Sequence, residues 1–392
     1  MTAPFNPHLL DTFAPPVMEA RRWLSGVTFP PDRPLLNLSQ AAPVDPPPEA
    51  LREVMARIVL EDPGSHLYGP VLGLPELREE VAVRWADAYG APGAIGADDV
   101  AITSGCNQAF CAAIQSLAAA GDEVILPLPW YFNHKMWLDM VGVTAVTLPS
   151  GADMVPRAED AAALIGPRTR AIALVSPNNP TGAEYPPEVL HAFLKLARDR
   201  GIALIVDETY RDFHSVDGPP HGLFQDREWR DTLIHLYSFS KVFRLTGHRI
   251  GAMIAAPDRL REIEKFLDTM SICPNQIGQR AALHGLRHLD DWVAREREEI
   301  LRRRALIEAG FATLDGWSLL GSGAYFAYVS HPFETPSDVL AQAMVRDQSL
   351  LVLPGTMFHP GPEGARQFRI AFANADADGI DTLFARLRGV RA

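Results

Sequence analysis

Residues 170–210 read RAIALVSPNNPTGAEYPPEVLHAFLKLARDRGIALIVDETY. This stretch holds two short apolar runs, at 170–175 (RAIALV) and 202–206 (IALIV), on either side of a segment with helical composition at 187–200. Short runs that are apolar throughout are typical of strands buried on both faces of a sheet. A strand, a helix and another such strand predict an α/β fold with a mostly parallel sheet between helices.

The same alternation extends outward from this stretch. Short strands are predicted at 100–103, 124–126, 144–148, 233–237 and 249–256, and helices at 107–120 and 134–141. The proline-rich first 48 residues indicate an extended arm with one short helix at 17–24. We expect three parts: this arm (1–48), a large domain (49–285) and a smaller domain (286–392).

The last part has a different order of predicted helices and strands. A long charged helix is predicted at 290–314, followed by strands at 325–329, 350–352 and 369–373, a helix at 337–346 and a terminal helix. This order predicts a smaller α+β domain, which the N-terminal arm packs against.

Composition excludes several classes of protein. The 392 residues are 47% hydrophobic and 21% charged, as in a folded globular protein, and the net charge is −12. The acidic balance argues against nucleic acid or an anionic membrane as the main partner. Three cysteines without a CxxC pair give neither a disulfide scaffold nor a metal site. No signal peptide and no apolar run of about 18 residues is evident, so we expect a cytoplasmic enzyme.

A lysine follows the apolar run at 233–237. Lys241 lies in the segment SFSKVFRLTGHR (238–249), with small hydroxyl residues before it and Arg249 eight positions after it. Most lysines are solvated surface groups. The alternative is a lysine that forms a Schiff base, with Ser238 and Arg249 binding a phosphate nearby.

Two more polar groups follow buried strands. Asp207 ends the run at 202–206, where ligands gather in open α/β sheets, and Tyr210 lies three positions later. Asp207 is either a turn or cap residue or a buried acid that keeps a ring nitrogen protonated, with the Tyr210 hydroxyl directed at the same ring. Asn179, in SPNNPTG (176–182), belongs either to an ordinary turn or to a site in which its amide donates to a phenolate oxygen.

Two further segments offer weaker signals. Gly105 joins the strand at 100–103 to the next helix, where free N–H groups bind phosphate in some proteins and nothing in others. In PWYFNH (129–134), Trp130 and Phe132 indicate core packing, whereas Tyr131 is a candidate to stack on a flat cofactor. His134 is either a core histidine or a hydrogen-bond partner behind Asp207.

Together these residues resemble those of the pyridoxal-phosphate-dependent aminotransferases of class I/II, fold type I, and in particular the aspartate/aromatic/kynurenine group. The resemblance runs from about residue 37 to the end. It rests on the order of Gly105, Tyr131, Asn179, Asp207, Tyr210, Lys241 and Arg249, on YGP (68–70) and GLPELR (73–78), and on PG (354–355), Phe358 and RIAFA (369–373).

The resemblance implies a seven-stranded sheet, pyridoxal 5′-phosphate as cofactor, and transfer of an amino group from an amino acid to a 2-oxo acid by a ping-pong reaction through the pyridoxamine form. Lys241 would form the Schiff base and move the proton at the substrate Cα, and Asp207 would pair with the ring nitrogen. Tyr210 and Asn179 would bond the 3-oxygen of the ring, and Tyr131 would stack on it. Arg369 would hold the substrate α-carboxylate. The phosphate would be held by Gly105, Cys106, Asn107, Ser238, Arg249 and, less directly, Ser240. Tyr68 would reach the phosphate of a neighbouring subunit, which implies a homodimer.

Some positions depart from the family pattern. Cys106 occupies a phosphate-turn position where relatives often carry small or hydroxyl residues, and its backbone N–H is its main contribution. Ala41, at the carboxylate end of the substrate site, replaces a glycine, and Asn107 stands where some relatives have lysine. We identify no basic residue for a side-chain carboxylate, so aspartate specificity is doubtful.

The same scaffold also supports β-elimination from sulfur amino acids and cyclopropane synthesis, and both need Lys241 and Asp207. A regulatory domain that binds the cofactor is a further alternative. The arm of about 48 residues is too short for a winged helix, and the net charge is acidic.

Overall fold

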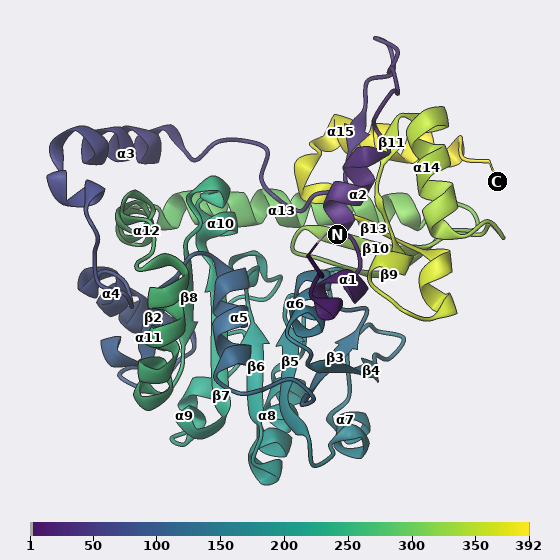
Figure 1. Ribbon diagram of the computed structural model, residues 1–392. Coiled ribbons are helices and arrows are strands. Elements are labelled where there is room, and N and C mark those ends of the chain that lie inside the picture. The colour runs from purple at the N-terminus through teal and green to yellow at the C-terminus, as the bar shows by residue number, and fades with distance from the viewer. Residues whose placement is uncertain (1–2, 392) are drawn as a thin grey trace.

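A seven-stranded sheet lies at the centre of the computed structural model, which describes residues 3–391 (Figure 1). The strand order is β2-β8-β7-β6-β5-β3-β4. All neighbouring pairs are parallel except the two that β8 makes, with β2 and with β7. The mostly parallel sheet predicted from the sequence is therefore confirmed. The strands are β2 (Val100–Thr103), β3 (Glu123–Leu128), β4 (Thr144–Pro149), β5 (Thr169–Val175), β6 (Ala203–Asp207), β7 (Leu233–Ser238) and β8 (Gly251–Ile254).

Strand β6 shows why these runs are apolar throughout. Leu204 and Val206 join the core on one face of the sheet, and Ala203 and Ile205 join the core on the other face. All four side chains are buried, because helices cover both faces. Helices α4 (Pro75–Ala88), α7 (Ala158–Leu164) and α8 (Pro187–Arg200) pack on the first face, and α5 (Cys106–Gln115), α6 (Phe132–Met140) and α11 (Pro257–Ser271) on the second.

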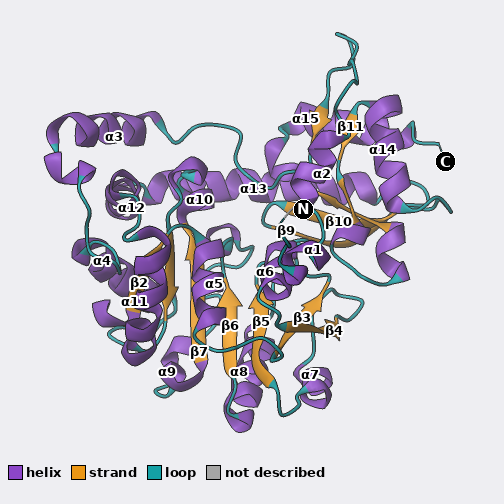
Figure 2. Cartoon of the chain, viewed as in Figure 1, coloured by secondary structure: helices purple, strands orange, loops and turns teal. Residues whose placement is uncertain are grey.

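The C-terminal part forms a smaller antiparallel sheet of order β12-β13-β10-β9 (Figure 2). Its strands are β9 (Ser318–Gly323), β10 (Phe326–Ser330), β12 (Leu353–Pro354) and β13 (Gln367–Ile370), with helices α14 (Ser337–Gln348) and α15 (Ala377–Arg388). The arm contributes β1 (Leu36–Asn37), which pairs in parallel with β11 (Leu350–Leu351). The division at residues 48 and 285 stays a prediction.

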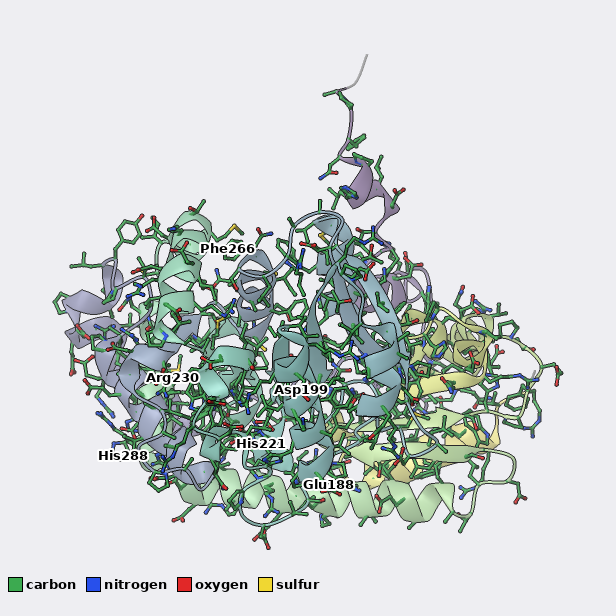
Figure 3. All side chains as sticks on the ribbon, turned by 90° about the horizontal axis from the view of Figure 1, so that it is seen from below. Glu188, Asp199, His221, Arg230, Phe266 and His288 are labelled. Atoms are coloured by element: carbon green, nitrogen blue, oxygen red, sulfur yellow. The ribbon has the colours of Figure 1, made fainter. Side chains whose placement is uncertain are left out.

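Helix α13 (Asp290–Phe311) is the longest in the described chain and runs from α12 (Gln276–His288), at the large sheet, to the smaller sheet, where it packs on β9 and α15 (Figure 1). Seen from below, it lies along one edge of the molecule, on the side away from the N-terminal arm (Figure 3). The other helices are α3 (Glu49–Glu61), α9 (Trp229–Thr232) and α10 (Phe239–Val242). Among residues 3–391 we find no helix with the length and apolar character needed to cross a membrane.

Two expectations about helices were wrong. The arm has two short helices, α1 (Pro7–Asp11) and α2 (Pro16–Arg22), because a proline begins each of them where its missing N–H costs no bond. Helix α5 ends at Gln115 and not at residue 120, since the chain must turn back before β3 begins at Glu123. Gly121 takes a φ of 92° within that turn.

Candidate active site

A cavity of about 670 Å³, counted with its open mouth, lies where β5, β6 and β7 end. Ten residues singled out from the sequence line it: Cys106, Asn107, Tyr131, Asn179, Asp207, Tyr210, Ser238, Ser240, Lys241 and Arg249. The carboxyl ends of neighbouring parallel strands meet at one edge of a sheet, so residues far apart in sequence converge here.

Asp207 is the buried acid of this cavity, with 3% of its surface exposed. Its Oδ2 lies 3.3 Å from His134 Nε2, and its Oδ1 accepts the backbone N–H of Thr209 at 3.0 Å. Burial alone would raise the pKa of Asp207, but the bonds from His134 and Thr209 outweigh it and lower the pKa below its ordinary value. The carboxylate is therefore ionised at neutral pH, and of the two readings of His134 the structure supports the partner behind Asp207. The His134 ring stacks on Phe110 at 3.7 Å.

Lys241 differs from the other three lysines of the chain. Lys135, Lys195 and Lys265 each lie within 2.6 Å of a carboxylate oxygen, whereas Lys241 Nζ donates to the carbonyl oxygen of Ala41 at 2.8 Å. Burial, and then the positive charges of Arg249 and Arg369, lower its pKa from 10.5 to about 8. A sizeable fraction of the amine is thus neutral, and nucleophilic, near neutral pH.

The turn between β2 and α5 forms a donor-rich end of the cavity. Gly105 has a φ of 86°, and a Cβ there would lie 2.4 Å from Arg249 Nη2, so only glycine lets the guanidinium come this close. The first N–H groups of α5, at Cys106 and Asn107, have no acceptor within the helix and suit an anion. Arg249 also donates to the Ser240 hydroxyl at 3.4 Å.

Ser238 and Cys106 complete this end of the cavity. The Ser238 side chain accepts the backbone N–H of Ser240 at 3.2 Å and so caps the short helix that carries Lys241. Burial, together with the charge of Asp207, raises the pKa of the Cys106 thiol well above its usual range, which keeps the thiol protonated.

Arg369 approaches from β13 of the smaller sheet and is 2% exposed. Its Nη1 donates to Asn179 Oδ1 at 2.9 Å, and its Nη2 donates to the Ser39 carbonyl oxygen. Its Nε is buried with no partner among the described residues, and burial lowers the pKa of the guanidinium to about 10. A buried cation that meets only uncharged oxygens has capacity for an external carboxylate.

Two tyrosines form the remaining polar wall. The Tyr131 hydroxyl donates to Asn107 Oδ1 at 3.2 Å, and Lys241 Nζ lies 5.7 Å from the centre of the Tyr210 ring. Burial raises the pKa of both phenols, so both remain protonated donors. Tyr68 is 79% exposed and does not line the cavity, so its role toward a neighbouring subunit stays a prediction.

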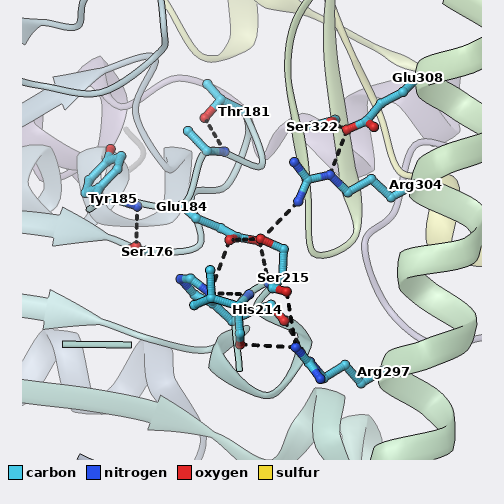
Figure 4. Close-up of polar contacts among 12 residues, drawn as sticks. Ser176, Thr181, Glu184, Tyr185, His214, Ser215, Arg297, Arg304, Glu308 and Ser322 are labelled. Atoms are coloured by element: carbon cyan, nitrogen blue, oxygen red, sulfur yellow. Dashed lines mark hydrogen bonds and ion pairs between the residues drawn. The ribbon is translucent and has the colours of Figure 1, made fainter. Parts of the chain in front are cut away.

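The loop that carries Asn179 is fastened at its far end by Glu184 (Figure 4). The Glu184 carboxylate accepts the N–H of Ser215 at 2.9 Å and lies 3.1 Å from His214 Nδ1. Arg304 of α13 donates to it at 3.3 Å. The loop is thus tied both to the segment after Tyr210 and to the long helix under the smaller sheet.

Two lining residues were not predicted from the sequence, Val175 and Thr209. Their positions in the sequence could have indicated both residues, because Val175 ends a buried strand and Thr209 lies between Asp207 and Tyr210. Neither side chain type indicates chemistry by itself, which is why the sequence did not single them out.

Comparison with known proteins agrees with this geometry. The model of the family "Aminotransferase class I and II" matches residues 33–387. An aromatic aminotransferase of Arabidopsis thaliana is 28% identical over 97% of this chain and 94% of its own. An aspartate/prephenate aminotransferase of Thermus thermophilus is 30% identical over 83% and 84% of the two chains. A solved aspartate aminotransferase from Thermus thermophilus with maleate is 25% identical, superposes with a TM-score of 0.88 and covers 100% of both chains.

The fold and the site define a fold type I enzyme whose cavity holds a buried lysine. The chain belongs to the class I and II aminotransferases and is a pyridoxal-phosphate-dependent aminotransferase.

The residues of the cavity fit that cofactor. The close approach of Arg249 to Gly105, beside the free N–H groups of α5, provides donors for a phosphate. Ionised Asp207 suits a protonated ring nitrogen, and within residues 3–391 Lys241 forms no ion pair with a carboxylate that would hold it as an ammonium ion. The donors and the acceptor of the site thus match the phosphate, the ring and the aldehyde of pyridoxal phosphate.

Proposed function

We propose that this aminotransferase moves the α-amino group of an amino acid to a 2-oxo acid by a ping-pong reaction. The observation that carries the proposal is the arrangement of three groups around one cavity: unpaired Lys241, ionised Asp207 and the buried guanidinium of Arg369. The first 2-oxo acid leaves before the second one enters, and the amino group remains in the site between the two events.

Binding and orientation follow from the charges of the site. Arg369 offers the fork of donors that a carboxylate accepts in bidentate fashion, and Asn179 Oδ1 holds that fork in place. Arg249 and the first turn of α5 would hold the phosphate, and the Asn179 amide and the Tyr210 hydroxyl would donate to the ring oxygen. A substrate bound by its α-carboxylate then presents its Cα to Lys241.

Proton transfer is the role of Lys241. Pyridoxal phosphate, when bound, supplies an aldehyde that condenses with amines and a protonated ring that withdraws electrons from the substrate Cα. The Lys241 amine, with a pKa of about 8, takes the proton from Cα as a general base. Asp207 would keep the ring nitrogen protonated, and His134 helps to keep Asp207 ionised and in place.

We also infer a homodimer in which Tyr68 reaches the neighbouring site. Tyr68 is 79% exposed. Two apolar side chains close to it in sequence, Leu60 and Leu67, are also exposed, and so is Met270 of α11. A second copy of the chain would cover such groups, and the phenol would then contact the neighbour's phosphate.

The two half-reactions test the function directly. An amino acid mixed with the enzyme in the absence of 2-oxo acid should remove the absorbance of the aldehyde form and release one equivalent of 2-oxo acid. A second 2-oxo acid should restore the absorbance. Pyruvate and ammonia formed from cysteine conjugates, with no loss of the aldehyde absorbance, would instead identify a β-lyase.

A further inference from the structure

The cavity contains few positive charges for a substrate. Lys241 and Arg249 are the cations among its lining residues, and Arg369 is bonded to the lining residue Asn179. Each already has a part in the proposed function, on which this inference rests. Lys241 would bond the aldehyde and accept the Cα proton. Arg249 would bind the phosphate, and Arg369 would bind the α-carboxylate.

The cations just outside the cavity are engaged elsewhere. Arg244, three residues after Lys241, lies 2.6 Å from Glu296 and 3.5 Å from Asp45. Lys135 lies 2.5 Å from Asp139. Arg21 of α2 donates to the Gln40 side chain at 2.7 Å and is exposed to solvent, where a charge discriminates weakly between ligands.

The surroundings of Arg369 are aromatic. The centres of the Phe132, Phe326 and Phe358 rings lie 5.9, 5.3 and 5.0 Å from its guanidinium carbon, and all three rings are buried. The Tyr131 ring adds another aromatic face to the cavity wall. The three phenylalanine rings enclose Arg369, and the aromatic residues that line the cavity itself are Tyr131 and Tyr210, so the wall that flanks the α-carboxylate anchor is aromatic and uncharged.

Asn107 is an exposed, uncharged polar residue of the cavity lining. Its Oδ1 accepts the Tyr131 hydroxyl, so the amide NH₂ is the group it presents to a ligand. An amide is neutral and cannot balance a carboxylate. A second substrate carboxylate beside Asn107 would meet a neutral amide, and one pressed against the aromatic wall would lose water without gaining a cation.

We propose that the site takes amino acids with uncharged side chains, aromatic ones included, and discriminates against aspartate and glutamate. The count of cations covers residues 3–391 of one chain. Several relatives carry aspartate in their names, so this inference separates the chain from them on its own residues.

Binding and turnover together test the inference with the holoenzyme. We expect kcat/KM for phenylalanine and methionine to exceed that for aspartate and glutamate by about 10²-fold. Calorimetry with unreactive acids gives a readout that needs no turnover. Butanoate should bind at least as tightly as succinate, which has a second carboxylate in place of the methyl group, and 3-phenylpropanoate should bind more tightly than both.

Substitutions at Asn107 and Arg21 test which residue sets the preference between aspartate and phenylalanine. Asn107→Lys should raise the ratio of aspartate to phenylalanine kcat/KM about tenfold or more, whereas the neutral Asn107→Gln should not. Calorimetry of succinate should shift in the same direction for Asn107→Lys, even if the variant turns over slowly. Arg21→Gln should leave the wild-type ratio unchanged.

The outcomes separate the two proposals. If only aspartate and glutamate react and succinate binds more tightly than butanoate, the inference is overturned while the aminotransferase function stands. A loss of aspartate activity in Arg21→Gln would likewise overturn it, by identifying the missing cation. If no amino acid removes the aldehyde absorbance, the proposed function itself fails.

Discussion

Asp207 and Lys241 have opposite requirements, and the residues around each of them meet those requirements. Asp207 must stay charged although it is buried, and the His134 and Thr209 bonds achieve this. Lys241 must lose its charge near neutral pH, and burial beside two guanidinium groups favours that. The fold thus places a stable anion and a readily deprotonated amine in the same cavity.

Replacing the anion tests its contribution. Asp207→Asn keeps the shape of the side chain but removes the negative charge that faces the ring nitrogen. We expect kcat to fall by about 10²–10³-fold while the cofactor stays bound through Lys241 and Arg249. Steady-state kinetics and the visible spectrum measure both effects. The exposed Asp199→Asn is the matched control, and equal losses in the two variants would contradict the role of Asp207.

The pKa of Lys241 predicts how cofactor capture depends on pH. A neutral amine attacks an aldehyde and an ammonium ion does not, so the capture rate of the cofactor-free enzyme should rise as pH rises through about 8. Arg369→Leu removes a nearby positive charge and should move the midpoint upward, toward the ordinary 10.5. Stopped-flow absorbance measures the rate, and a wild-type midpoint near 10.5 would contradict the account.

At the scale of elements, the turn between β2 and α5 depends on one glycine. Gly105→Ala would place a Cβ 2.4 Å from Arg249 Nη2 in backbone with positive φ. We expect a loss of about 1–3 kcal/mol in the free energy of unfolding and about tenfold weaker cofactor binding. Gly93 also has a positive φ but open space around it, so Gly93→Ala should lose stability alone. Thermal unfolding and cofactor titration distinguish the two effects.

The strands were predictable because their apolar character does not depend on distant contacts. The runs at 170–175 and 202–206 are apolar on both faces, and the structure has β5 and β6 at 169–175 and 203–207. The end of α5 was not predictable, since it is set by the turn that leads into β3. Of the two helices of the arm, α2 corresponds to the helix expected at 17–24, whereas α1 escaped prediction because it is only five residues long.

The candidate site was predictable in part for a related reason. Residues at strand ends, such as Asp207, converge by topology, so their grouping follows from the order of the strands. The pairing of Arg369 with Asn179 joins a strand of the smaller sheet to the loop after β5, 190 positions apart, and no local pattern contains it. The unpaired state of Lys241 likewise depends on the fold, because it requires knowing which lysines lie near carboxylates.

At the scale of the whole molecule, the proposed dimer makes a testable statement about shared sites. Lys241→Ala and Tyr68→Ala should each be strongly impaired as purified proteins. When the two variants are co-expressed, half of the dimers should be mixed, and each mixed dimer holds one intact site. Roughly a quarter of the wild-type activity should therefore return. No recovery, with mixed dimers demonstrated by mass, would show that Tyr68 acts within its own subunit or not at all.

The proposed chemistry depends on Lys241 as the residue that bonds the cofactor. Borohydride reduction of the holoenzyme followed by peptide mass spectrometry measures this directly, and the chain offers only four lysines to distinguish. We expect the phosphopyridoxyl mass on the peptide that contains Lys241, and none on peptides with Lys135, Lys195 or Lys265. A label on any of those three, or no label on a coloured enzyme, would contradict this role of Lys241.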